Sequence, residues 1–171
     1  VAGYSIDLES NEMAAVVSYQ YTDRLSLHGG ARIVKTEMDL SVTPAGGYML
    51  STGSDTGFGY LLGVSYAVPE RGARVTLTYN SAVKHSFDST EFGSTAFGQT
   101  NMELPQSLKL DAEMALNSKT LLFGSVKWSD YSAFEVAAPG FATLVVPGAS
   151  VINYQEDNLV ASLGMGRSLN D

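Results

Sequence analysis

The sequence has no cysteine and no long apolar run, and both absences limit what the chain can be. Without cysteine among the 171 residues, disulfides and thiolate sites are excluded. Because no run reaches about 18 apolar residues, a membrane-spanning helix is excluded as well. The mean hydropathy of +0.03 fits a soluble protein, but it fits a membrane β-barrel equally well because barrel strands alternate lipid-facing and lumen-facing residues.

Positive charge and histidine are also scarce. The chain carries 10 Lys and Arg against 18 Asp and Glu, a net charge of -8, so it lacks the basic patch that would bind nucleic acid. The two histidines, His28 and His85, match no metal-ligand spacing. Ser86 and Asp88 follow His85 in an alternating segment that points neighbouring side chains to opposite faces, which argues against a serine triad. We therefore expect no enzyme, no cofactor and no metal.

Period-two alternation recurs along the whole chain, whereas helical spacing is almost missing. The segment 73–87, for example, places Val75, Leu77 and Tyr79 on one face and Thr76 and Thr78 on the other. The pattern predicts about eight strands, at residues 3–8, 13–22, 25–42, 56–67, 73–87, 106–116, 120–134 and 158–168. We expect an all-β chain, forming an antiparallel up-and-down transmembrane β-barrel segment that is part of a larger barrel.

The connections alternate in length. Short turns are expected at residues 22–24, 69–72, 117–119 and 170–171, and long loops at 43–55, 88–105 and 135–157. Every second connection of a meander lies at the same end, so all long loops share one end. Short periplasmic turns and long extracellular loops are typical of bacterial outer-membrane barrels.

Aromatic residues gather near both ends of the predicted strands, as expected for girdles at the two lipid–water boundaries. The general preference of aromatic residues for strands is the alternative explanation. Those near the long-loop end are Phe58, Tyr60, Phe87, Trp128, Tyr131 and Phe134, and those near the short-turn end are Tyr19, Tyr21 and Tyr66.

Two pairs of segments carry a family resemblance. Residues 55–63 (Asp-Thr-Gly-Phe-Gly-Tyr-Leu-Leu-Gly) precede residues 75–85 (Val-Thr-Leu-Thr-Tyr-Asn-Ser-Ala-Val-Lys-His). Residues 104–107 (Leu-Pro-Gln-Ser) precede residues 126–134 (Val-Lys-Trp-Ser-Asp-Tyr-Ser-Ala-Phe). In this order, over roughly residues 12–171, they resemble the FadL-type family of outer-membrane transporters for long-chain fatty acids and related hydrophobic compounds.

The resemblance implies a barrel of about fourteen strands with an N-terminal plug and a kinked wall strand that opens sideways to the lipid. This chain shows only about eight strands, no plug and no C-terminal aromatic residue. We expect residues 1–171 to form a single barrel segment, without separate domains, cut at both ends from a longer protein.

Two sets of residues are candidates for binding a hydrophobic ligand. The first is apolar and lies in predicted loops, which either capture the ligand or fold down and pack on one another: Phe141, Leu144, Val145 and Val146, with Tyr48, Met49 and Leu50 as a weaker second group. The second is cationic and is predicted to point inward, where it either binds a carboxylate headgroup or pairs with carboxylates such as Asp111 and Glu113: Arg32, Lys84, Lys109 and Lys127.

The acidic residues near the long-loop end either bind divalent cations that bridge lipopolysaccharide or form a solvated rim; they include Asp55, Asp88, Glu91 and Asp157. We predict passive transport of hydrophobic small molecules, such as long-chain fatty acids, through the bacterial outer membrane, with membrane lipid and lipopolysaccharide as partners. A structural or adhesive barrel with a closed lumen, and a soluble all-β binding module, are the alternatives.

Overall fold

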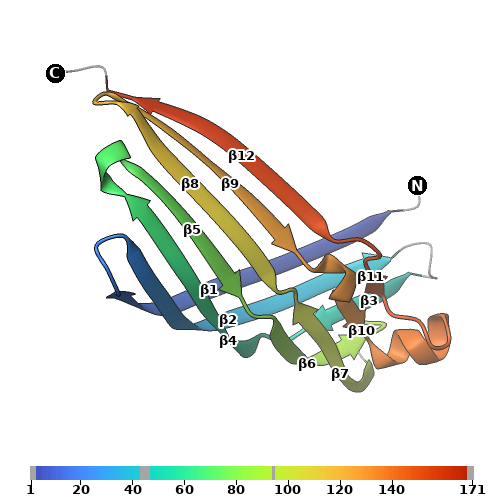
Figure 1. The fold of residues 1–171 in the computed structure, drawn as a ribbon. Helices are drawn as coiled ribbons and strands as arrows, with labels where there is room; N and C mark the ends of the chain where they lie inside the picture. Colours follow the sequence, from blue (N-terminus) through green and yellow to red (C-terminus); the bar gives the residue numbers. More distant parts are fainter. Residues whose placement is uncertain (1–2, 43–46, 94, 169–171) are drawn as a thin grey trace.

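The computed structural model of the protein describes residues 3–42, 47–93 and 95–168, except for the side chains of residues 4 and 95–97. Over these residues the chain forms one antiparallel sheet of twelve strands. Seven strands form a curved wall (Figure 1): β1 (Tyr4–Gln20), β2 (Leu25–Val42), β4 (Asp55–Val68), β5 (Ala73–Asn80), β8 (Ser107–Asn117), β9 (Thr120–Ser129) and β12 (Asn158–Arg167). Each pairs with the next in this order, and β1 and β12 are not paired with each other, so the described sheet is open.

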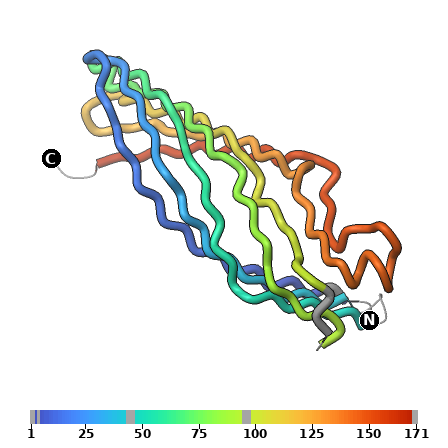
Figure 2. The backbone as a smooth tube through the Cα atoms, turned by 90° about the horizontal axis from the view of Figure 1, so that it is seen from below, coloured from blue at the N-terminus to red at the C-terminus, as the bar shows by residue number. Residues whose placement is uncertain are grey.

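The remaining strands gather with two short helices at one end of the wall, which we call the cap. It comprises β3 (Tyr48–Thr52), β6 (Val83–Glu91), β7 (Thr95–Leu104), β10 (Glu135–Ala137) and β11 (Ile152–Asn153), with the short helices η3 (Tyr131–Ala133) and η4 (Phe141–Val145). These strands continue the sheet from the end of β2 in the order β3-β6-β7-β10-β11. Figure 2 shows the wall strands side by side, with the cap segments gathered at one end and the short turns at the other.

The three expected long loops supply most of the cap, and the ends of the predicted strands 73–87 and 120–134 supply the start of β6 and η3. The expected short turns lie at the opposite end. Residues 21–24, the 3-10 helix η2 (Pro69–Arg71) with Gly72, and residues 118–119 connect neighbouring wall strands there. Gly72 adopts a left-handed conformation, with φ 53°, which tightens the turn after η2. The expected turn at residues 170–171 lies outside the described residues. The asymmetry of loop lengths is confirmed for the described connections.

Strand register places the apolar side chains of the wall on its exterior. Residues paired across an antiparallel ladder point to the same face of the sheet. Ile33 and Phe58 therefore lie on one face of the wall, and Arg32, Lys109 and Lys127 lie on the other. The exterior side chains are exposed, and they include Met13, Val17, Tyr19, Leu27, Ile33, Phe58, Tyr60, Leu62, Tyr66, Val75, Leu77, Leu108, Leu110, Met114, Val126, Leu159, Leu163 and Met165. The interior face is mainly polar, although Val16, Phe123 and Val160 also lie there.

The two faces exchange character near the cap. After Ile33 the exterior of β2 continues with charged residues, and its interior becomes apolar and buried. The exterior side chains there are Lys35, Glu37 and Asp39, and the interior ones are Val34, Met38 and Leu40. Strand β1 changes beside it, from Met13, Val17 and Tyr19 outside to Asp7, Glu9 and Asn11 outside. The apolar band on the wall therefore ends before the cap begins.

The antiparallel all-β prediction is confirmed, while several boundaries differ. Residues 3–8 and 13–22 belong to one strand, β1, and the predicted strand 25–42 is found as β2. The predicted strand 73–87 was wrong, because it breaks at Ser81 and Ala82 into β5 and β6. No helix in the described ranges is both long and apolar enough to cross a membrane.

Candidate functional site

An apolar core fills the cap. It lies between the interior face at the end of β2 and the facing side chains of the cap strands, which continue the same face of the sheet. Its buried members are Met38, Leu40, Tyr48, Leu50, Phe87, Met102, Phe134, Val136, Ala138 and Phe141. Phe87 and Phe134 were expected in an aromatic girdle, and that placement was wrong because both are buried in this core. Phe58 and Tyr60 do lie on the exterior at this end of the wall.

The predicted capture loop divides into buried and exposed parts. The Phe141 ring is buried and meets the Tyr48 ring edge-on, with centroids 5.0 Å apart. Val145 is partly buried against the same core. Leu144 and Val146 point away from it and are 61% and 46% exposed. The packing alternative thus describes Phe141, whereas Leu144 and Val146 present apolar surface at the outer end of the molecule.

The second apolar group lies in a strand rather than in a loop. Tyr48, Met49 and Leu50 form part of β3, which pairs with β2 and β6. Tyr48 and Leu50 are buried in the core, while Met49 lies on the opposite, exposed face. Alternation within β3 therefore separates the three residues, and they do not form one binding surface.

Glu91 was expected in a cation-binding or solvated acidic rim, and that was wrong, because its side chain is fully buried in the cap. Its Oε1 accepts a hydrogen bond from the Gly140 amide at 2.8 Å, and its Oε2 accepts bonds from the Phe141 amide at 2.8 Å and the Tyr48 hydroxyl at 2.7 Å. Burial, followed by the bond to Glu91, raises the pKa of Tyr48 far above its ordinary value. The phenol therefore remains a donor to Glu91.

A second polar group lies where β6 crosses the interior of β4. A Cβ on Gly57 would come within 2.4 Å of Val83, and one on Gly59 within 2.8 Å, so the crossing depends on both glycines. The buried His85 ring bonds Asp55 through Nδ1 at 3.0 Å and Thr36 through Nε2 at 3.4 Å. Asp55 and His85, expected in a rim and on a wall strand, are brought together by the break in strand 73–87.

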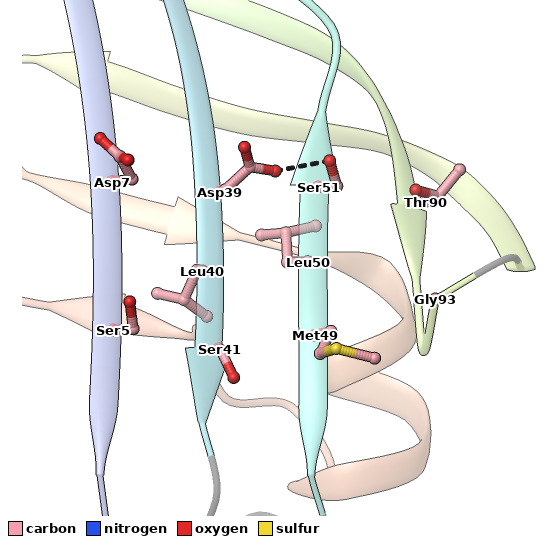
Figure 3. A pocket seen from close by; sticks show the side chains of 10 residues that line it. All are labelled: Ser5, Asp7, Asp39, Leu40, Ser41, Met49, Leu50, Ser51, Thr90 and Gly93. Atoms are coloured by element: carbon pink, nitrogen blue, oxygen red, sulfur yellow. Dashed lines mark hydrogen bonds between the residues drawn. The ribbon is translucent and has the colours of Figure 1, made fainter.

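A shallow pocket of about 360 Å³ lies on the exterior face of β1, β2, β3 and β6. In Figure 3, Asp7, Asp39, Ser51 and Thr90 form a row across it, and the Ser51 hydroxyl donates a 2.5 Å hydrogen bond to Asp39. Met49 points toward Gly93 at its border. Serine, threonine and aspartate side chains line this pocket together with Leu40, Met49 and Leu50, so its surface is mixed in character.

The four predicted cations have different surroundings. Arg32 lies on the wall interior, bonds both oxygens of Glu12 at 2.8 Å, and donates to the Ser81 carbonyl at 3.3 Å. Lys84 was expected to point inward, and that was wrong: it lies on the solvent-exposed face of β6, where its side chain is 84% exposed and 3.6 Å from Glu103. The break before β6 separates it from the wall.

Lys109 and Lys127 are directly opposite each other on the interior of β8 and β9. Lys109 pairs with Asp111 at 2.7 Å, as the pairing alternative expected. Lys127 has no ion-pair partner within 4 Å among the described residues. Its side chain is exposed on the interior face of the wall. Like charges directly opposite on two strands are unfavourable, so this pair favours an anion nearby.

Residues 1–165 match the family model described as outer membrane protein transport protein (OMPP1/FadL/TodX). No curated protein sequence matches the chain. The fold is similar to the Ralstonia pickettii toluene transporter TbuX (TM-score 0.71, 16% identity, 97% of this chain and 53% of that one). It is also similar to the Pseudomonas putida toluene transporter TodX (TM-score 0.68, 17% identity, 97% and 53%) and to a Pseudomonas aeruginosa FadL homologue (TM-score 0.68, 14% identity, 97% and 48%). The chain spans about half the length of these proteins.

Proposed function

Because the chain belongs to the outer membrane protein transport protein family (OMPP1/FadL/TodX), a family of the bacterial outer membrane, we propose that it forms part of a passive channel for hydrophobic small molecules. The observation that carries this proposal is the reversal of polarity between wall and cap. An apolar exterior matches lipid over the length of the wall, and an apolar cap core with exposed Leu144 and Val146 stands outside it.

The route begins at the cap and ends in the membrane. A hydrophobic molecule gains about 25 cal/mol for each Å² that it removes from water, so the apolar surface of Leu144 and Val146 is a favourable first contact. The molecule then passes along the wall interior and leaves toward lipid. No energy source or cofactor enters this scheme.

Closure of the channel requires strands beyond these seven. β1 and β12 both run from the cap toward the short turns, because the seven wall strands alternate in direction. A closed, fully antiparallel barrel has an even number of strands, so an odd number of further strands would complete it. Membrane lipid then surrounds the exterior band, and lipopolysaccharide is the expected neighbour of the charged exterior of β1 and β2.

We further propose that the substrate carries an anionic headgroup on an apolar body, as a long-chain fatty acid does. The support is the interior position of Lys127 opposite Lys109, with no carboxylate within 4 Å of it among the described residues; Glu12, which Arg32 binds, is the carboxylate that its charge reaches. The solved toluene transporters are named for a neutral aromatic hydrocarbon, which makes that class the competing substrate. A carboxylate gains from a nearby ammonium group, whereas toluene does not.

Uptake by cells that express the full-length protein tests both levels of the proposal, with radiolabelled oleate and radiolabelled toluene as probes. Uptake of either probe above empty-vector controls supports the channel, and uptake of neither removes it. The Lys127→Ala variant is expected to lower oleate uptake about five- to tenfold, the loss of one charge-assisted hydrogen bond, and to leave toluene uptake unchanged. Equal effects on both probes would contradict the headgroup role, and Lys119→Ala, in a short turn, is the charge-matched control.

A structural or adhesive barrel is the second candidate. The packed cap core favours it, because Tyr48, Leu50 and Val136 are at most 1% exposed. Such a protein would fold and insert normally yet carry neither probe. The uptake measurement on the unmodified protein therefore separates the two candidates.

A further inference from the structure

We infer that Glu91 is the positioning residue of the capture segment: one buried carboxylate holds residues 139–149 so that Leu144 and Val146 face outward. This inference rests on the proposed function and adds the residue that sets the geometry of first contact. Glu91 lies at the end of β6, almost fifty positions before the segment in sequence, and it is completely buried.

The hydrogen bonds of the segment show why one residue has this role. The other bonds of residues 139–149 are local. Along the backbone, Ala142 donates to Ala138, which directly precedes the segment, Val146 to Phe141, Gly148 to Ala142 and Ala149 to Val146, and the Thr143 hydroxyl donates to Pro139. Among the described bonds, only those from the Gly140 and Phe141 amides to Glu91 join these residues to another part of the protein. The segment is thus a self-contained turn with a single polar anchor.

Apolar contacts alone would not define the orientation of this turn. Phe141 meets the Tyr48 ring edge-on, and Val145 packs on the core, but such contacts are not directional enough to select one arrangement. The two amide bonds to Glu91 are directional, and they are formed in a buried site where an unpaired amide would be costly. Tyr48 donates the third bond and orients the carboxylate.

A buried carboxylate is an expensive way to hold a loop, since removing a charge from water costs several kcal/mol unless hydrogen bonds replace the water. Here three donors replace it, and no cation lies among its described hydrogen-bond and ion-pair partners. The result is a turn that is rigid at its buried start and carries its two most exposed apolar side chains, Leu144 and Val146, three and five residues later. A rigid apolar surface binds with a smaller loss of conformational entropy than a mobile one.

The test combines hydrogen exchange with transport in the full-length protein. In the Glu91→Gln variant, amide exchange of residues 139–149 is expected to become about tenfold faster than in the unmodified protein, because one amide loses its acceptor. The half-saturation concentration for oleate or toluene uptake, whichever the unmodified protein carries, should rise several-fold while the maximal rate stays the same. A change in capture without a change in maximal rate is not expected from general loss of folded protein.

Two further variants keep the test decisive. Asp88→Asn makes the same chemical change three residues earlier in β6, on the exposed face, and should alter neither exchange nor uptake. Tyr48→Phe removes one donor to Glu91 and keeps the ring that meets Phe141, so it should produce a smaller change in the same direction even if Glu91→Gln folds poorly.

Unchanged exchange at residues 139–149 in both Glu91→Gln and Tyr48→Phe would overturn the anchoring. Faster exchange with an unchanged half-saturation concentration would show that the anchor has no part in capture, which also overturns the inference. Uptake by the unmodified protein is measured before that of any variant. If it shows no uptake, the proposed function is removed, whatever the exchange data show.

Discussion

The wall and the cap are built from the same kind of alternating strand, yet they place apolar residues on opposite faces. In the wall, Leu62 and Leu163 point outward and are exposed, and Asp111 and Lys127 point inward. In the cap, Phe87 and Met102 point inward and are buried, and Ser86 and Asn101 point outward. The same free energy of removing apolar surface from water explains both, because the wall is surrounded by lipid and the cap by water.

The transition from wall to cap occurs within single strands. β2 runs continuously from the wall into the cap. Its apolar side chains point to the exterior up to Ile33 and to the interior from Val34 onward. The polypeptide therefore marks the edge of the hydrocarbon layer by a shift of one residue in its alternation. The comparison predicts that the same kind of substitution will change stability by very different amounts in the two regions.

The largest expected difference is between two phenylalanines. Phe87→Ala removes a ring that is 1% exposed in the cap core and should lower the free energy of unfolding by about 3 to 5 kcal/mol. Phe58→Ala removes a ring that is 72% exposed on the wall exterior and should cost much less, because lipid fills the space. Denaturant unfolding of both variants in lipid vesicles measures the difference. Equal losses would show that the two regions do not have the different surroundings inferred here.

The next comparison introduces a charge. Leu62→Arg places a cation on the lipid-facing side of β4, where it should cost about 2 to 4 kcal/mol of unfolding free energy in vesicles. Thr90→Arg places the same side chain on the exposed face of β6 and should change stability by less than about 0.5 kcal/mol. A small effect of Leu62→Arg would mean that this part of the wall meets water instead of lipid.

The sequence predicted the wall well because each wall strand keeps its apolar side chains on the same face over most of its length. Leu108, Leu110 and Met114 outside, with Lys109, Asp111 and Glu113 inside, follow directly from period two once lipid is assumed. The change of phase in β2 was also visible, as the adjacent apolar pair Ile33 and Val34, and it would have located the cap boundary.

The cap was predicted less well, for a physical reason that Val83 and Lys84 illustrate. The alternation of residues 73–87 continues across Ser81 and Ala82 without a change, but the strand breaks there and the odd-numbered face turns from lipid to the cap core. The break depends on long-range bonds: the Ser81 hydroxyl accepts from the Tyr60 amide and the Ser81 carbonyl accepts from Arg32. Glu91 was expected in a rim instead of a core for the same reason, since its partners Gly140 and Phe141 are distant in sequence.

The smallest expected effect concerns the junction between the cap and the wall at Asp157. The Ser132 amide and hydroxyl, and then the Trp128 indole, hold the pKa of this carboxyl below its ordinary value of 3.8. A lowered pKa in the folded state means that the carboxylate stabilises the junction fully above about pH 4, and that this contribution is lost as the pH falls below that value. Because Asp157 is exposed to solvent, the change should be local.

Trp128 reports on this change directly, since it is the single tryptophan of the chain and its indole N–H donates to Asp157 at 2.9 Å. Its fluorescence should stay constant from pH 7 to about 4 and change below that value as the acceptor is protonated. In Asp157→Asn the emission should differ already at pH 7, and the acidic step should disappear. An acidic step that persists unchanged in this variant would assign it to another carboxyl, and the cap would then be joined to the wall by its apolar contacts and strand pairing without help from this charge.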